Sequence, residues 1–251
     1  MPRSTRLLQL AAAMAALLLA VGCASRPINP PLDQFQPDRG YRPALLLRQR
    51  ENNDPTTLFV LSFSGGGTRA AAMSYGVLEE LRLTEYVADT GEPRRLIDEI
   101  DVITGVSGGS FTALAYALFG DRLFDEYEQR FLKRNVQGAL SRRFFLNPYN
   151  WFRLMSGNFG RSEIAAEYYD EILFEGATFD DLLRERAGPV ALATATDLST
   201  GSRLAFFQND FLRCFTLAQS AVDRLPSHCF YARGLAALFM LIGQQSLGET
   251  E

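Results

Sequence analysis

Two glycine-rich turns, which lie about forty residues apart, constrain the fold of this chain more than any other feature. The first is the run SGGGTR at residues 64–69, and the second is the run GVSGG at residues 105–109. Each follows an apolar run of strand length, at residues 58–63 and 100–104, and precedes apolar residues at helical spacing, first over about residues 68–83. A strand–loop–helix order that repeats in this way is typical of an α/β protein with parallel neighbouring strands.

The apolar pattern predicts the other elements of the domain. Residues 58–63 are apolar on both faces, as a buried parallel strand requires, and a third strand is predicted at residues 190–196. The helix after the second turn has so little polar character that we expect it to be buried. The chain between this helix and the third strand is predicted to be mainly helical, with an amphipathic helix over residues 121–134, a helix capped by Ser162 and a capping box at residues 178–181.

A dense aromatic stretch lies among these helices, at residues 144–152. The interpretation that we favour is packing in the core, with a turn at Asn147-Pro148. The alternative is functional, because the rings would line an acyl-chain pocket or face a membrane.

The first 22 residues have the pattern of an export signal. Two arginines precede an apolar run at residues 7–21, which is too short to span a bilayer comfortably. Small residues directly before Cys23 resemble the bacterial lipobox, so we expect cleavage before Cys23 and lipid attachment to it. The alternative is an ordinary secretory signal with an incidental cysteine. Ala24 resembles the pattern of outer-membrane sorting, so we expect an exported bacterial lipoprotein of the outer membrane.

Length and composition fit one domain with short appendages. The 251 residues are 47% apolar and carry a net charge of −4, which gives no electrostatic basis for binding nucleic acid. We expect a proline-rich tether at residues 23–56, the domain at residues 57–211 and a divergent tail at residues 212–251. With one histidine and no metal-ligand spacing, we expect no metal and no cofactor. Cys214 and Cys229 form a disulfide or stay unpaired.

The second turn has the G-x-S-x-G spacing of a nucleophile elbow. Such an elbow holds a serine exposed on a sharp strand-to-helix turn, and Gly105 and Gly109 remove side chains that would clash there. Ser107 would then lie at a helix N-terminus, where free N–H groups and the helix dipole favour developing negative charge. Ser107 is therefore the candidate nucleophile of an acyl hydrolase.

The first turn supplies candidates for an oxyanion hole. Consecutive glycines at positions Gly65, Gly66 and Gly67 reach backbone angles at which their N–H groups converge on one point. Arg69 is placed to orient that loop or to screen the charge. A phosphate-binding loop is the competing interpretation. However, no Gly-Lys-Ser/Thr follows, and a dinucleotide fingerprint needs glycine where Ala70 stands.

The general base is less evident than the nucleophile. His228 is the only histidine, and a Ser-Asp-His triad that used it would have the chain order of α/β-hydrolases. A carboxylate that acts directly on Ser107 is the alternative that we favour.

The two turns, the helix between them and the run ATDLSTG at residues 195–201 resemble the patatin-like phospholipase family. The resemblance covers residues 57–211, and residues 147–179 are similar to its bacterial exported branch. It implies a three-layer α/β/α fold with a mostly parallel central sheet, a Ser-Asp dyad without histidine, and hydrolysis of acyl esters in phospholipids or other lipids. By position, it makes Ser107 the nucleophile and the glycines of the first turn the oxyanion hole, with Arg69 beside them.

One part of the family pattern is missing from this chain. The family's catalytic aspartate lies in an Asp-Gly-Gly or Asp-Gly-Ala turn, and no Asp-Gly dipeptide follows Ser107. Asp197, Asp210 and Asp223 are the late aspartates, and Asp197 matches a family position that is not the base. We expect an incomplete C-terminal part, with a frameshifted or truncated tail at residues 212–251. The alternatives to an active lipid hydrolase are an inactive lipoprotein that serves as a binding module and a histidine-dependent esterase.

Overall fold

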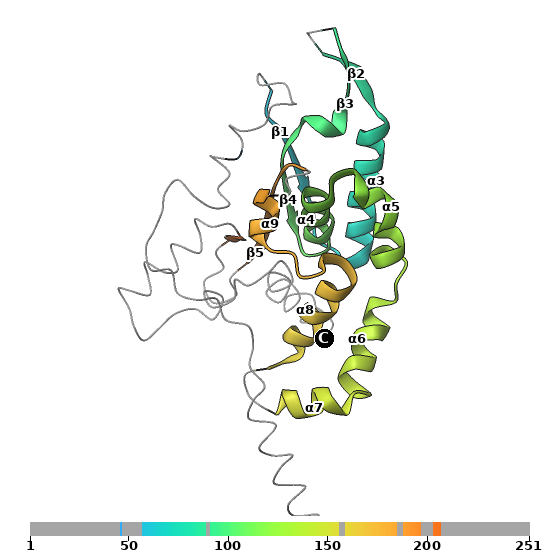
Figure 1. Ribbon diagram of the computed structural model, residues 1–251, viewed down its shortest axis with the longest axis vertical. Helices are drawn as coiled ribbons and strands as arrows, with labels where there is room; N and C mark the ends of the chain where they lie inside the picture. The colour runs from blue at the N-terminus through green and yellow to red at the C-terminus, as the bar shows by residue number, and fades with distance from the viewer. Residues whose placement is uncertain are drawn as a thin grey trace, which may run out of the picture.

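The computed structural model of the protein describes residue 46 and residues 57–88, 91–155, 159–184, 188–196 and 203–206 (Figure 1). Outside these residues lie the predicted signal, Cys23 and most of the tether, as well as Asp197, Asp210, Cys214, Asp223, His228, Cys229 and the predicted tail.

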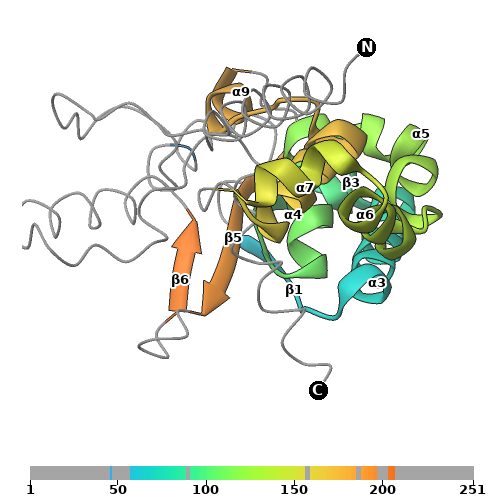
Figure 2. The same ribbon diagram turned by 90° about the horizontal axis from the view of Figure 1, so that it is seen from below.

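A four-stranded sheet forms the centre of the described fold. Its order is β1 (Phe59–Phe63), β4 (Ile100–Val106), β5 (Val190–Thr196) and β6 (Arg203–Phe206). The first three strands run parallel to one another, and β6 runs antiparallel to β5, beside which it lies in Figure 2. A mostly parallel sheet flanked by helices confirms the predicted α/β class.

The prediction that the first strand is buried on both faces is wrong. β1 is an edge strand of the described sheet, and its residues alternate between half-buried and exposed up to Phe63, with Val60 47% exposed. β4 lies between two strands and is buried along most of its length, as predicted for an inner parallel strand. The Asp101 carboxylate of β4 accepts a hydrogen bond from the Phe59 N–H at 2.8 Å, which holds the start of β1 beside β4.

The two helices that follow the glycine turns form the core with the sheet. They are α3 (Gly67–Leu83) and α4 (Gly108–Phe119), and every residue of α4 except Phe119 is buried, as predicted. The Thr112 hydroxyl of α4 donates to the Ala71 carbonyl of α3 at 3.0 Å and accepts from the Tyr127 hydroxyl at 2.8 Å. Burial raises the pKa of the Tyr127 phenol well above its ordinary value, so this link stays neutral and intact at physiological pH.

Short elements complete the described fold. They are β2 (Glu85–Val87), β3 (Pro93–Arg95), η2 (Leu96–Glu99), η3 (Gly120–Arg122), α5 (Leu123–Tyr127), η4 (Glu128–Leu132), α6 (Val136–Phe145), α7 (Pro148–Leu154), α8 (Arg161–Tyr169), η5 (Asp170–Phe174) and α9 (Phe179–Arg184). β2 and β3 form a separate antiparallel pair, and η4 and η5 are π-helical turns. The amphipathic helix predicted over residues 121–134 is thus three successive helical pieces, η3, α5 and η4.

Of two predicted helix starts, one is confirmed and one is wrong. The capping box at residues 178–181 is confirmed, because the Asp181 carboxylate accepts from the Thr178 N–H at 2.7 Å and the Thr178 hydroxyl accepts from the Asp181 N–H at 3.4 Å. Ser162 does not cap α8. That helix begins at Arg161, with Gly160 in the cap position two residues before Ser162, and the Glu163 side chain accepts from the Gly160 N–H at 2.8 Å, which fixes the entry of the chain.

The aromatic stretch at residues 144–152 has the predicted turn but not the favoured burial. Asn147 caps α7, because its side chain accepts from the Tyr149 N–H at 3.0 Å. Phe145, Tyr149 and Trp151 are all more than half exposed, so packing in the core is wrong for these rings. On α7, the buried Asn150 faces inward and donates to the Arg143 carbonyl at 3.0 Å, which leaves Tyr149 and Trp151 outside. Phe145 is the last residue of α6.

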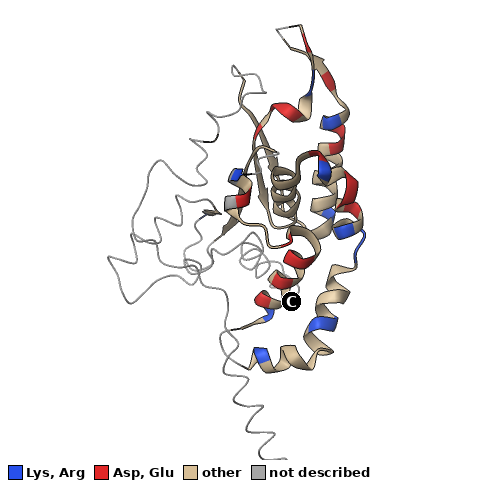
Figure 3. Ribbon diagram, viewed as in Figure 1, with Lys and Arg blue, Asp and Glu red and all other residues tan. Residues whose placement is uncertain are grey.

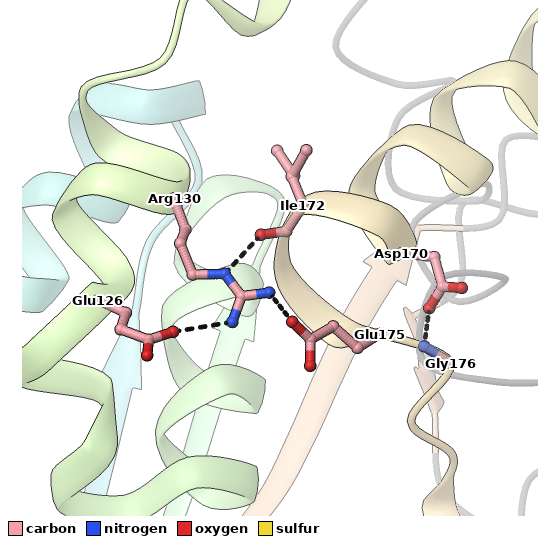
Figure 4. Close-up of polar contacts among 6 residues, drawn as sticks. All are labelled: Glu126, Arg130, Asp170, Ile172, Glu175 and Gly176. Carbon is pink, nitrogen blue, oxygen red and sulfur yellow. Dashed lines mark hydrogen bonds and ion pairs between the residues drawn. The ribbon is translucent and has the colours of Figure 1, made fainter.

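Arg130 joins the two π-helical turns (Figure 4). Its Nε donates to the Ile172 carbonyl at 3.0 Å, Nη1 donates to Glu126 at 3.0 Å, and Nη2 pairs with Glu175. We expect Arg130→Ala to lower the free energy of unfolding by about 1–2 kcal/mol, mostly through the lost bond to the backbone, since exposed ion pairs contribute little. Urea denaturation measures this loss.

The matched control for that prediction is Arg134→Ala. Arg134 is exposed, and its side chain forms no ion pair with any residue that the structure describes. We expect its replacement to change stability by at most about 0.5 kcal/mol. Equal losses in the two variants would contradict the role given to Arg130.

Candidate active site

The two glycine turns meet at the edge of the sheet where the parallel strands β1 and β4 end. β1 and β4 are adjacent and parallel, with Phe63 opposite Gly105, so both strands end at the same edge. The chain then leaves each strand through its glycines and enters α3 or α4 directly. Because the carboxyl ends of parallel strands are where α/β proteins place their ligand sites, this edge is the candidate active site.

Ser107 has the backbone conformation of a strained turn. Its φ is 48° and its ψ is −121°, and it directly precedes α4. Among the described residues, Ser107 and Glu175 alone have positive φ without being glycine. Such strain persists only where the surroundings enforce it, and it is typical of a nucleophile on a strand-to-helix turn.

The glycines of the second turn have no room for side chains. A Cβ on Gly105 would lie 2.6 Å from the Gly109 carbonyl carbon, and one on Gly109 would lie 2.7 Å from both the Phe63 Cβ and the Ser64 oxygen. Gly105 and Gly109 therefore allow the sharp turn, as expected from the G-x-S-x-G spacing.

Gly108 makes the tightest approach between the two turns. A Cβ on Gly108 would lie 2.0 Å from the Gly67 carbonyl oxygen, so the two turns are in backbone contact. The spacing of the motif does not reveal this contact, because it joins segments that lie far apart in the sequence. It fixes the first turn against the second.

The first turn lies directly beside Ser107. A Cβ on Gly65 would come within 3.3 Å of the Ser107 Cβ, and Gly66 and Gly67 have φ values of 139° and 62°. Residues other than glycine rarely adopt these positive φ values, which explains why glycine occupies both positions. Arg69 lies in the first turn of α3, exposed and without an ion pair to any described residue.

The electrostatics of this edge favour negative charge. Both α3 and α4 begin here, and neither has an acidic residue in its first turn. Free N–H groups at helix starts carry partial positive charge, so an oxyanion beside Ser107 would be stabilised. Within the described part of the chain, no side chain hydrogen-bonds to the Ser107 hydroxyl.

Ser110 is a feature of the site region that the sequence did not reveal. It lies in the first turn of α4, is fully buried, and has no hydrogen-bond partner for its Oγ among the described residues. The local sequence does not indicate this burial, because it depends on the sheet that α4 covers.

No metal centre and no membrane span are found in the part of the chain that the structure describes. There, no group of three or more His, Cys, Asp or Glu side chains is arranged to hold a metal ion. None of the described helices is both long and apolar enough to cross a bilayer.

A strained serine between a parallel strand and a buried helix, faced by a glycine loop, defines the class of α/β proteins with a nucleophile elbow. The sequence profile of the family described as patatin-like phospholipase matches residues 61–226. The match spans more than half of the chain, and the protein belongs to this family. The family resemblance expected from the sequence is thus confirmed, and lipid hydrolysis is the activity at the level of the family.

The solved structures that match this chain include human GIVD cytosolic phospholipase A2 in complex with methyl γ-linolenyl fluorophosphonate, at 16% identity and a TM-score of 0.41. A second structure of that enzyme, with the inhibitor and terbium chloride, matches at 19% identity and a TM-score of 0.34. Each alignment covers 78% of this chain and 28% of the human chain, so this chain spans well under half the length of that enzyme. None of the curated proteins matches the sequence.

Proposed function

We propose that this protein is a serine acyl hydrolase that cleaves esters of phospholipids or related lipids, with Ser107 as its nucleophile. The observation that carries the proposal is the Ser107 backbone, strained at positive φ within contact distance of the glycine loop. Membership of the patatin-like phospholipase family supports a lipid as the substrate.

The proposed reaction uses the residues at the sheet edge. The Ser107 Oγ attacks the ester carbonyl carbon while a base takes its proton, and the N–H groups of Gly65, Gly66 and Gly67 hold the oxyanion. Arg69 lies beside that loop and screens the charge. Collapse of the intermediate expels the alcohol, and water then releases the fatty acid from Ser107.

We propose an aspartate as the base, in a Ser-Asp dyad of the kind that the family resemblance implies. The proposed location is a bacterial membrane, where acyl chains on Cys23 would hold the domain near its substrate. The order of signal, small residues and cysteine in the sequence supports this anchor.

A fluorophosphonate probe tests the proposed function. The probe phosphonylates a serine only when that serine is activated, so we expect one labelled peptide, which contains Ser107. We expect His228→Ala to keep both the labelling and the hydrolysis of a phospholipid, because a dyad needs no histidine. Loss of labelling in a folded His228→Ala variant would contradict the dyad and support the triad.

Two observations favour a second candidate, an inactive lipoprotein that binds lipid without hydrolysing it. No Asp-Gly turn follows Ser107 in the sequence, and no described residue hydrogen-bonds to its hydroxyl. The same probe separates the two candidates, since a folded protein that stays unlabelled would contradict the hydrolase and support the binding module.

A further inference from the structure

The corner between α6 and α7 exposes a group of large apolar side chains. Five of the exposed large apolar residues in the described structure fall in this one short segment, which we call the α6–α7 corner: Phe145, Leu146, Tyr149, Trp151 and Met155. Their exposed fractions range from 51% to 74%. Single exposed apolar residues are ordinary on a protein surface, but a contiguous group marks an interaction site.

The exposed apolar residues of α7, together with its C-cap Met155, lie on the outward half of the helix. Helical residues are about 100° apart around the axis, and the buried Asn150 marks the inward direction. Tyr149, Trp151 and Met155 all lie more than a quarter turn from Asn150 on this wheel. The face that α7 turns away from the core is therefore aromatic and apolar, without a charge.

The charges around the corner have one sign. No Asp or Glu occurs from residue 129 to residue 162, although the whole chain has a net charge of −4. The same stretch holds seven basic residues: Arg130, Lys133, Arg134, Arg142, Arg143, Arg153 and Arg161. Figure 3 shows α6 and α7 with basic positions and no acidic ones, whereas α8 carries acidic positions.

The basic side chains divide into paired and unpaired ones. Arg143 and Arg153 pair with Glu171 and Glu167 of the neighbouring helical segment, which holds the corner in place. Arg142 is exposed and, like Arg134 and Arg161, forms no ion pair with a described residue. None of the three has an acidic partner in the described structure, so their charges can meet an external partner with negative charge, although Arg161 also lies over the Phe144 ring at 5.3 Å.

An anionic lipid surface fits these observations better than a second copy of the chain. Trp and Tyr are enriched where proteins meet the membrane interface, and basic residues beside an apolar helix face bind anionic headgroups. A symmetric dimer through the corner would place the same basic residues opposite one another, at a cost in repulsion.

We propose that the α6–α7 corner is a membrane-binding surface, which inserts its apolar side chains among lipid chains and sets its free arginines against anionic headgroups. Its purpose, to bring the domain onto a bilayer substrate, rests on the proposed function. It is separate from any acyl anchor on Cys23, because it lies on the folded domain itself.

Trp151 makes the proposal directly testable. It is the single tryptophan of the chain, and it is 51% exposed, with its Nε1 donating to the Phe144 carbonyl at 2.9 Å. We expect its emission to shift to the blue on vesicles that contain phosphatidylglycerol, and to be quenched by brominated acyl chains. The measurement uses the full chain with Ser107→Ala, so that the vesicles stay intact.

Trp151 emission reports only on the α6–α7 corner, so it distinguishes insertion of the corner from anchoring through another part of the chain. Protein that sediments with vesicles while Trp151 emission stays unchanged would overturn the proposal. Emission that is already blue-shifted in buffer and varies with protein concentration would also overturn it, in favour of a second copy of the chain.

Leu146→Ser is the matched test of the apolar contribution. We expect it to weaken the vesicle-dependent quenching of Trp151 about fivefold, since one buried side chain leaves the lipid. Leu83→Ser is the control, because Leu83 is 75% exposed and Leu146 is 74% exposed, but Leu83 lies at the end of α3. Equal effects in the two variants would contradict the proposal.

Arg142→Glu tests the charge. We expect it to weaken binding to anionic vesicles about tenfold or more, because a cation near the surface is replaced by an anion. Arg122→Glu, an exposed arginine in η3, is expected to have little effect. On vesicles of phosphatidylcholine alone, Arg142→Glu and wild-type protein should behave alike, and equal weakening on both vesicle types would contradict the electrostatic part.

A water-soluble short-chain ester separates this proposal from the proposed function. Hydrolysis of that ester needs no lipid surface and reports on Ser107 alone. Hydrolysis without insertion of Trp151 overturns the membrane-binding surface and leaves the hydrolase in place. Insertion of Trp151 without hydrolysis by the unsubstituted protein overturns the hydrolase and supports the surface.

Discussion

Ser107→Ala is expected to abolish ester hydrolysis, with a loss of kcat/KM of at least about 10⁴-fold. Ser107 supplies the only hydroxyl on the strained turn between β4 and α4, so its removal leaves nothing to form the acyl-enzyme. Binding of the lipid should persist, because the glycine loop and the sheet edge are unchanged. Initial rates on a short-chain ester and on phospholipid vesicles measure the loss.

Ser110→Ala is the matched control for this prediction. Both serines belong to the same strand-to-helix segment, but Ser110 is fully buried and its Oγ has no described partner. An unpaired buried hydroxyl costs about 1–3 kcal/mol, so we expect Ser110→Ala to keep the activity and to leave stability equal or higher. Activity that survives in Ser107→Ala but not in Ser110→Ala would show that the nucleophile is misassigned.

Gly108→Ala is expected to destabilise the fold by at least about 3 kcal/mol and to remove activity at the same time. The added Cβ would lie 2.0 Å from the Gly67 carbonyl oxygen, and a backbone atom cannot rotate away as a side chain does. Relief of this clash requires the two glycine turns to separate. Separation moves the Gly65–Gly67 loop away from Ser107 and disrupts the proposed oxyanion hole.

Gly76→Ala is the control, because Gly76 is an exposed position within α3 with open space where the Cβ would be. Alanine favours the helix over glycine by about 1 kcal/mol, so we expect this variant to be more stable than the wild type. Urea denaturation of the two variants gives both numbers. A Gly108→Ala protein with wild-type stability would contradict the contact between the turns.

The sequence predicted the elements that carry a strong local pattern. β4, β5 and α4 are mostly apolar, and they are largely buried because they lie inside the sheet or against it. β1 has a similar composition but is half exposed, because strand order, which composition does not encode, puts it at the edge of the described sheet. Ser162 has the residue type of a cap, but Gly160 takes the cap position two residues earlier, where its N–H donates to the Glu163 side chain.

The candidate site, like the fold, was predictable where the pattern is local and not where it depends on distant segments. The spacing around Ser107 indicates the turn, and the glycines at residues 65–67 indicate the loop, because both signals lie within a few adjacent residues. The contact of Gly108 with Gly67 and the burial of Ser110 were not predictable, since each depends on segments that come together only when β1 pairs with β4.

The sequence by itself determined the α/β class, the family, and the two turns in which Ser107 and the three glycines lie, because short-range patterns of apolar residues and glycines encode these features. Only the tertiary structure decided how closely the turns approach and which aromatic rings face outward. Phe144 and Trp151 look alike as members of one apolar run, but Phe144 is half-buried whereas Trp151 is more than half exposed. Phe144 lies on α6 and Trp151 lies on α7, and burial follows the face of the helix on which a residue lies rather than the hydrophobicity of the residue.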